Sequence, residues 1–374
     1  MTSGTYDLAV AGGGAIGLAC AWRAAERGLC TVVLDAGDPG AWEVAAGMLA
    51  PVAEVDFGDA PVLELGLRSA RAFPGFCAAL ADYGVDPGYR PGGTLVVARD
   101  RDEAEALDRL LAFRRELDLE VERLLPSRAR RLEPALAPTV RLALDAPGDH
   151  SVDPRRMVAA MAAAFERTGG TLRRRTRATA VVTEGGRAVG VRAGDGVVRA
   201  DRVLLAPGTG SVDLPEAARV PVRPVKGQVL RLRDPRGPGL VERTIRGAEA
   251  YLVPRADGGY VLGATMEERG YDTAPTAGGV YELLRDMSEI VPGVLELEVE
   301  ELRAGLRPAT PDNLPAVGRG ALEGLVWATG HFRNGILLAP VTAELAVAAV
   351  CDEPLPEWAA AADPLRFARQ EAAV

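Results

Sequence analysis

The chain has 374 residues, 48% of them hydrophobic and 25% charged, which is the composition of a globular enzyme. Its length predicts two domains or one elaborate domain, and its net charge of -9 argues against a nucleic-acid-binding protein. The four cysteines form no CxxC pair and only two histidines are present, so we expect neither a metal site nor a disulfide framework. We expect the protein to be located in the reducing cytoplasm.

The apolar stretches do not predict a membrane protein. The longest late stretch, 335–350, is interrupted by Glu344 and is too short to cross a bilayer. The first basic residue, Arg23, follows the first apolar segment, whereas a secretory leader begins with basic residues. We therefore expect no membrane partner.

The first 35 residues predict a βαβ unit: a strand, a glycine-rich turn, a helix and a second strand. Gly12, Gly14 and Gly17 match G-x-G-x-x-G, in which the glycines permit the turn, the approach of a pyrophosphate and close helix packing. Asp35 ends the second strand, where its carboxylate can accept hydrogen bonds from a ribose. A plain glycine turn with a surface aspartate is the alternative. The unit predicts dinucleotide binding without deciding between FAD and NAD.

Helical and strand patterns alternate through the rest of the chain. Asp153 before Pro154 is typical of a helix N-cap. The pattern predicts helices at 61–81, 101–117, 154–167, 280–290 and 335–350, the last amphipathic. It predicts strands at 178–182, 188–192, 203–206, 228–232, 251–254, 260–264 and 325–328. The nucleotide-type beginning and end, with alternating strands between them, indicate a discontinuous cofactor domain interrupted by a substrate domain.

Six segments carry a resemblance to a known family. They are AAGMLAP at 45–51, PVKGQ at 224–228, YLVPR at 251–255, GATM at 263–266, GLRP at 305–308 and ATGHFRNGI at 328–336. In this order they resemble the glycine oxidase branch of the D-amino-acid oxidase-like flavoproteins, over nearly the whole chain. The resemblance implies FAD rather than NAD. Sarcosine oxidase relatives attach the flavin to a cysteine near GLRP, and none occurs between Cys77 and Cys351, so non-covalent FAD is expected.

The resemblance also implies the fold. It is an α/β fold with a Rossmann-like FAD-binding domain of the glutathione-reductase type and an α+β substrate domain built on an antiparallel sheet. The expected FAD-binding domain comprises 1–88, 140–220 and 305–374, and the substrate domain comprises 89–139 and 221–304. A homo-oligomer, as a dimer or tetramer, is also expected.

The same resemblance implies the catalytic residues. Arg307 and Tyr251 are implied to hold the substrate carboxylate, a role for which a forked guanidinium is suited, and Arg333 is implied to lie near the flavin or the site's mouth. A surface salt bridge and a core tyrosine are the alternatives for the first two. Met48 and Met266 are expected in the substrate pocket, or otherwise as core methionines. Glu249 stands where some glycine oxidases have another polar residue, so substrate preference is expected to differ.

The expected cofactor contacts combine the fingerprint with the family segments. In the family, the turn containing His331 and the following helix N-terminus face the flavin, although a buried structural histidine is the alternative. The implied cofactor-binding residues are Gly12, Gly14, Ala15, Ile16, Gly17, Asp35, Ala45, Ala46, Gly47, Met48, Gly208, Gly330, His331, Arg333, Asn334, Gly335 and Ile336. No Ser or Thr lies between Gly37 and Met48, which departs from the family pattern.

The expected reaction is FAD-dependent oxidative deamination of glycine, with sarcosine and small D-amino acids as further substrates. Hydride transfer to flavin N5 would be followed by imine hydrolysis and by peroxide formation from dioxygen. The resemblance also suggests that the imine is handed to a thiazole synthase for thiamine biosynthesis. The alternatives are a sarcosine or D-amino-acid oxidase, a dye- or quinone-linked dehydrogenase, and a non-catalytic dinucleotide-binding protein.

Overall fold

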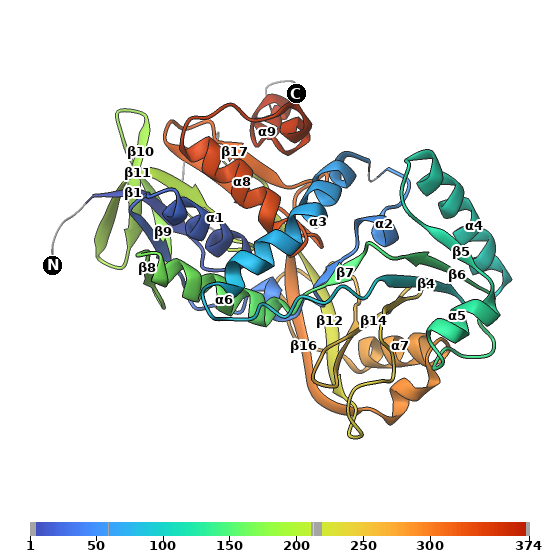
Figure 1. Ribbon diagram of the computed structural model, residues 1–374. Coiled ribbons are helices and arrows are strands. Elements are labelled where there is room, and N and C mark those ends of the chain that lie inside the picture. Colours follow the sequence, from blue (N-terminus) through green and yellow to red (C-terminus); the bar gives the residue numbers. More distant parts are fainter. Residues whose placement is uncertain (1–4, 59, 211, 213–218, 372–374) are drawn as a thin grey trace.

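The computed structural model describes residues 5–58, 60–210, 212 and 219–371, and two large sheets organise it (Figure 1). The first sheet has the order β17 (Ala316–Arg319), β18 (Leu325–Thr329), β11 (Gly196–Leu205), β1 (Tyr6–Ala11), β2 (Thr31–Leu34) and β8 (Thr171–Arg173). Its strands are parallel except for β17. The antiparallel strands β9 (Ala178–Glu184) and β10 (Arg187–Ala193) extend from β11. This is the predicted Rossmann-like arrangement.

Helices α1 (Ala15–Glu26), α6 (Pro154–Arg167) and α8 (Ala339–Val350) cover one face of this sheet, and α3 (Ala60–Ala81) packs against α6 and α8. Their aromatic side chains, among them Trp22, Phe73 and Phe165, belong to the largest core, which is otherwise mainly aliphatic. Asp153 caps α6 by accepting the N–H groups of Arg155 and Arg156, as its sequence predicts. The expectation for the last helix was wrong in two respects.

The last helix, α8, begins at Ala339 rather than at Gly335, and it is buried everywhere except at Glu344. It is not amphipathic, because α1 and α3 lie on one side of it and strands of the first sheet lie on the other. A helix covered from both sides is apolar all round.

The second sheet has the order β16 (Glu298–Ala309), β12 (Arg223–Arg233), β15 (Gly259–Gly263), β14 (Tyr251–Pro254), β13 (Thr244–Arg246), β4 (Thr94–Ala98), β6 (Leu142–Ala146) and β5 (Glu122–Leu124). All neighbours are antiparallel except β13 and β4. The predicted antiparallel sheet is therefore present, but the sequence patterns indicated no strand at β4, β6 or β16. Helices α4 (Arg101–Glu116), α5 (Pro126–Leu132) and α7 (Ala277–Ser288) lie on this side of the molecule (Figure 1).

Two expected domain boundaries fall near strands of the second sheet. Position 305 lies inside β16, which pairs with β12 over its whole length. Position 140 precedes β6, which pairs with β4. The division into domains stays a prediction.

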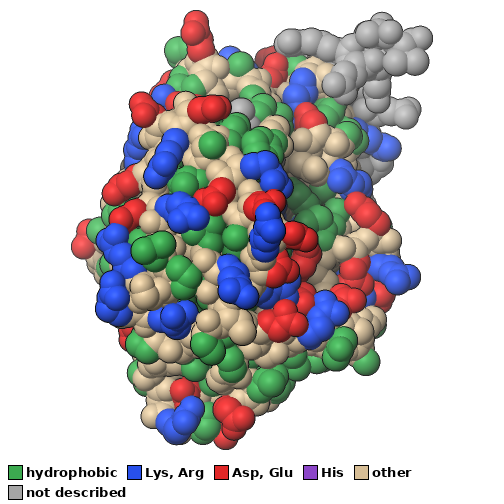
Figure 2. Space-filling view, turned by 90° about the vertical axis from the view of Figure 1, so that its right-hand side faces the viewer, with side chains coloured by type: hydrophobic (Ala, Val, Ile, Leu, Met, Phe, Trp, Pro, Cys, Tyr) green, Lys and Arg blue, Asp and Glu red, His purple; other side chains and the backbone are tan. Residues whose placement is uncertain are grey.

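Short elements complete the chain: the strands β3 (Met48–Leu49) and β7 (His150–Ser151), the helices α2 (Pro51–Glu54) and α9 (Leu365–Glu371), and the 3-10 helices η1 (Ala41–Glu43), η3 (Pro292–Glu296) and η4 (Glu357–Ala362). On the face in Figure 2, acidic and basic side chains are intermingled around a hollow that contains apolar side chains. Within the described part of the chain, no helix is long and apolar enough to cross a membrane, and no cluster of His, Cys, Asp and Glu could hold a metal ion.

Candidate active site

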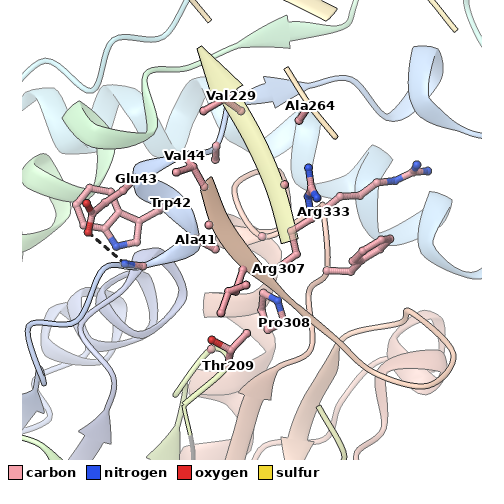
Figure 3. Close-up of a pocket in the computed structure, with 18 of the residues that line it drawn as sticks. Ala41, Trp42, Glu43, Val44, Thr209, Val229, Ala264, Arg307, Pro308 and Arg333 are labelled. Carbon is pink, nitrogen blue, oxygen red and sulfur yellow. Dashed lines mark hydrogen bonds between the residues drawn. The ribbon is translucent and has the colours of Figure 1, made fainter. Parts of the chain in front are cut away.

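One large cavity lies between the two sheets. It has a volume of about 1310 Å³ and extends from the turn after β1 to β14 and β16. Ordinary small-molecule sites measure roughly 300–1,000 Å³, so this cavity has room for a dinucleotide together with a small substrate. Figure 3 shows Trp42 and Glu43 on one side of it and Arg307 and Arg333 on the other. The two ends of the cavity differ in construction.

The first end, which we call the nucleotide end, is formed by Gly12, Gly14 and Asp35. Gly12 has φ +119°, and a Cβ on it would lie 2.2 Å from the carbonyl oxygen of Ala206. A Cβ on Gly17 would lie 1.9 Å from the carbonyl oxygen of Gly12, so α1 packs against the turn only because residue 17 is glycine. The G-x-G-x-x-G spacing is therefore required by this turn.

The nucleotide end fits a dinucleotide. Gly14 caps α1 without a side-chain hydrogen bond, and its missing Cβ would meet only Trp42, at 3.6 Å. The chain itself does not use that space, and the first N–H groups of α1 are available to a phosphate there. Asp35 lines the cavity after β2, and its Oδ1 accepts the N–H of Gly37 at 3.2 Å. Its remaining acceptor capacity suits ribose hydroxyls.

Most of the expected cofactor residues line the cavity, including Gly12, Gly14, Ala15, Ile16, Asp35, Ala45, Ala46, Gly47, Met48, Gly208, His331, Arg333, Gly335 and Ile336. Gly17, Gly330 and Asn334 do not line it. Gly17 serves the packing of α1, and Gly330 has φ +74° where a Cβ would lie 2.4 Å from the Thr310 side chain. Their direct cofactor contacts stay predictions.

His331 is buried beside α8. Its Nε2 lies 2.9 Å from the Thr342 hydroxyl, and burial lowers the pKa of the imidazole to about 3. The ring is therefore neutral and contributes no positive charge to the cavity. Any stabilisation of a reduced flavin from this turn must come from backbone groups or from Arg333, which also lines the cavity, and not from His331.

The second end, which we call the substrate end, contains Arg307 on β16. Its Nη1 donates to the carbonyl oxygens of Lys226 and Thr265, at 3.2 and 3.1 Å. A Cβ on Gly227, in the neighbouring strand, would lie 2.4 Å from either terminal nitrogen, so this glycine makes room for the guanidinium. Burial lowers the pKa of Arg307, and the guanidinium has no ion pair with the described residues. A cation in this setting requires an anionic ligand.

Tyr251 lies across the sheet from Arg307. A Cβ on Gly263 would lie 2.7 Å from the Tyr251 hydroxyl, so here too a glycine makes room for a functional side chain. Burial raises the pKa of Tyr251, and nearby Arg307 opposes that shift. The phenol therefore stays protonated near neutral pH and can donate a hydrogen bond.

The remaining predicted residues surround these two. Arg333 lines the cavity, and its Nη2 donates to the backbone oxygen of Glu54 at 3.2 Å. Met48 and Tyr251 both pack against a small apolar cluster that includes Ala46 and Val229 of the cavity wall. Met266 and Glu249 also line the cavity, and both are largely exposed, with Met266 at 64%. Met266 is therefore not a core methionine, while its contact with substrate stays a prediction.

Sequence reasoning missed an ion pair in the same cavity. Arg246 ends β13 and Glu54 ends α2; both line the cavity, and Arg246 Nε lies 3.9 Å from Glu54 Oε1. Glu54 follows AAGMLAP closely, so the end of that segment was a usable signal. Arg246 belongs to no family segment, and only the pairing of β13 with β14 places it beside Tyr251.

The short helix α2 positions Glu54. The Asp149 carboxylate accepts the N–H groups of Val52 and Ala53, at 3.2 and 2.5 Å, and burial raises its pKa to about 7. At the other end, Arg114 Nη2 donates to the carbonyl oxygens of Ala53 and Val55. A four-residue helix has little stability of its own, so these two buried side chains hold it in place.

A single cavity thus joins a dinucleotide-binding turn to a cationic end with a tyrosine donor. The fold and the nucleotide end define a dinucleotide-cofactor enzyme. The family model described as FAD dependent oxidoreductase (DAO) matches residues 7–349, and the chain belongs to this family. Its cofactor is FAD, and the turn, the helix N-terminus and the Asp35 carboxylate of the nucleotide end fit such a group.

Named relatives agree with this family. The chain is 33% identical to the glycine oxidase of Bacillus licheniformis, over 94% of this chain and 95% of that protein. It is 34% identical to the bifunctional protein ThiO/ThiG of Trichormus variabilis over 91% of this chain, and it spans about half of that relative, 52%. The crystal structure of glycine oxidase from Geobacillus kaustophilus superposes with a TM-score of 0.90 at 30% identity, covering 97% of this chain and 99% of that one.

Proposed function

We propose that the chain oxidises the carbon–nitrogen bond of a small amino acid, with glycine as the leading substrate. The observation that carries the proposal is the Arg307 guanidinium, which lies in the cavity without an anionic partner among the described residues. Relatives named glycine oxidase, matched over at least nine-tenths of both chains, support glycine as the substrate.

The side chains at the substrate end account for binding. Arg307 offers its remaining N–H groups to the substrate carboxylate in a forked, charge-assisted contact, and the Tyr251 hydroxyl donates to the same carboxylate. These contacts fix the orientation of the substrate Cα, and positioning of this kind supplies much of the rate enhancement in such reactions. When bound, FAD supplies a two-electron acceptor that dioxygen can regenerate.

The products follow from the atoms of the substrate. Glycine loses two electrons and two protons and becomes an imine, which water hydrolyses to glyoxylate and ammonia. Dioxygen takes up the two electrons and two protons as hydrogen peroxide. No described residue has to act as a general base if the amine binds in its neutral form.

Replacement of Arg307 tests the assignment. The variant Arg307→Gln should lose a buried charge pair with the carboxylate, worth about 2–5 kcal/mol, and kcat/KM for glycine should fall by roughly 30- to 5,000-fold. Arg233→Gln is the matched control, since Arg233 is on the same sheet but pairs with Glu300 outside the cavity. Unchanged kinetics in Arg307→Gln, with FAD still bound, would remove Arg307 from the site.

Peroxide release by the purified holoenzyme in air separates the competing reactions. Peroxide with glycine establishes an oxidase, and higher efficiency with sarcosine or D-alanine places it in a neighbouring substrate class. Reduction of the flavin by these substrates without air, combined with no peroxide in air, identifies a dye- or quinone-linked dehydrogenase.

The biological role is a separate proposal. The relatives named ThiO/ThiG support a role for the glycine imine in thiazole formation, which restored growth of a thiazole-requiring strain would demonstrate. A homo-oligomer and a cytoplasmic location remain predictions from the sequence. Sedimentation of the holoenzyme measures the former.

A further inference from the structure

The wall of the nucleotide end contains a hydrogen-bond donor that the protein itself does not use. Trp42 lies in η1, lines the cavity and packs against the largest core. Its indole N–H has no hydrogen-bond partner among the described residues. The indole nitrogen of Trp22 also lacks a partner but is buried, whereas that of Trp42 is not enclosed in the core. A free donor at a cavity wall is suited to an acceptor on a ligand.

The indole of Trp42 borders the space in front of α1. A Cβ on Gly14, the N-cap of α1, would lie 3.6 Å from Cδ1 of Trp42 and 3.9 Å from its Nε1, so the nitrogen-bearing edge of the indole faces this glycine. The first N–H groups of α1 leave the helix at the same end and suit a phosphate. The indole N–H therefore lies beside the place where the pyrophosphate of a dinucleotide is expected.

A second glycine admits the indole to this position. A Cβ on Gly40 would lie 2.4 Å from Nε1 of Trp42, so an alanine at residue 40 would displace the ring. Gly40 has φ -90° and ψ 156°, a conformation that any residue adopts. Glycine is therefore required here by the indole and not by the backbone.

Charged side chains fix the turn that carries the indole. The carbonyl oxygen of Glu43 accepts Nε of Arg155 and Nη2 of Arg231, each at 3.0 Å. The Glu43 carboxylate accepts the N–H of Gly40 at 3.1 Å and closes the turn (Figure 3). Because these contacts hold η1 without the indole N–H, this donor stays available to a ligand.

The sequence gives this stretch a single side-chain donor. Between Gly37 and Met48 there is no Ser or Thr, and Trp42 is the one residue whose side chain carries an N–H or O–H group. A pyrophosphate is negatively charged, and hydrogen bonds to a charged acceptor are stronger than those between neutral groups. Trp42 can thus supply what a hydroxyl side chain would otherwise supply to the cofactor.

We propose that Trp42 is a cofactor-binding residue that donates its indole N–H to the pyrophosphate of FAD, beside the first N–H groups of α1. The ring packs against the core at the same time, so one side chain both closes the wall and binds the anion. The inference concerns the hold on the cofactor and does not depend on which amine is oxidised.

The affinity for FAD tests the donor. Trp42→Phe keeps an aromatic ring and removes the N–H, so the Kd for FAD should rise about 10- to 100-fold, as expected for a lost hydrogen bond to a charged group. Release of FAD on dilution of the holoenzyme, followed by flavin fluorescence, measures this Kd. Trp358→Phe is the matched control, since Trp358 is also partly buried but packs against Arg68 outside the cavity.

A double-mutant cycle tests the geometry. Gly40→Ala should weaken FAD binding to a similar extent, because the new Cβ displaces the indole. Adding Trp42→Phe to Gly40→Ala should then cause little further loss. Independent, additive losses would overturn the placement of the indole on which the assignment rests.

A spectroscopic measurement on the wild type detects the hydrogen bond directly. In holoenzyme with ¹⁵N-labelled tryptophan, the indole signal missing from Trp42→Phe identifies Trp42 among the four tryptophans of the chain. Its proton should resonate downfield of that of Trp358 and exchange more slowly with water. Unchanged FAD affinity in Trp42→Phe, with a loss only in Trp42→Leu, would mean that the ring packs against the cofactor without donating, and would overturn the proposal. None of these measurements needs a substrate, so they stand apart from the test of glycine oxidation.

Discussion

The nucleotide end and the substrate end of the cavity are built in different ways. Gly12, Gly14 and Asp35 lie within one short βαβ unit and act through backbone geometry and a single carboxylate. Arg307, Tyr251 and Arg246 come from three strands and present charged or polar side chains to the cavity. A cofactor site can therefore be local in sequence, whereas this substrate site exists only after the second sheet has formed.

The comparison predicts that a Gly→Ala substitution destabilises the protein in α1 and stabilises it in α3. In Gly17→Ala the new Cβ would lie 1.9 Å from the Gly12 carbonyl oxygen, which should destabilise the protein by about 3 kcal/mol or more and release FAD. In Gly75→Ala, inside α3, nothing lies within 4 Å of the new Cβ, so the protein should gain about 0.5–1 kcal/mol. Thermal unfolding and flavin content measure both. Equal stability of the two variants would contradict the packing role of Gly17.

At the substrate end, Tyr251→Phe should leave the fold intact and weaken substrate binding. A hydrogen bond to a charged group contributes about 1.5–3 kcal/mol, so kcat/KM for glycine should fall roughly 10- to 150-fold. FAD content should not change, because the nucleotide end is intact. Since burial raises the pKa of Tyr251, substrate binding in the wild type should not weaken through ionisation of this phenol between pH 7 and its ordinary value of 10. A loss of FAD in Tyr251→Phe would show that the two ends are not separable.

The smallest expected effect is a pH dependence of stability from Asp149. The pKa is about 7 in the folded protein and 3.8 in the unfolded chain, so between these values the folded state holds a proton that the unfolded state has lost. Stability from this group is complete below pH 3.8 and is lost as the pH rises toward 7. From pH 5 to 6 the loss should be about 1 kcal/mol. Asp149→Asn should remove this slope, as urea unfolding at the two pH values would show.

The same contrast explains what could be predicted from the sequence. The βαβ unit and its fingerprint were predictable because strand, turn and helix follow one another within 35 residues, whereas β8 and β17 of the same sheet were not predicted. The edge strand β16 was missed because most of it is only half-buried or exposed, which hides the strand pattern. Arg307 and Tyr251 were found through the resemblance alone. Arg246 was missed because its place depends on the register of β13 against β14, which no local pattern fixes.

The roles of Gly227 and Gly263 also could not be predicted from the sequence. Each gives space to a side chain on a neighbouring strand, Arg307 and Tyr251 respectively, and that relation is invisible until the strands are paired. Helix α8 illustrates the same limit, since apolar length alone could not show that the helix is covered from both sides.

The hairpin formed by β13 and β14 has a consequence for protein engineering and for divergence between relatives. It carries Arg246, Glu249 and Tyr251 within ten residues, and its tip at Ala248 and Glu249 is exposed. Hairpin tips accept insertions and replacements readily. Grafting this hairpin from a relative would therefore replace all three of these side chains at once, while the nucleotide end of the cavity would stay unchanged.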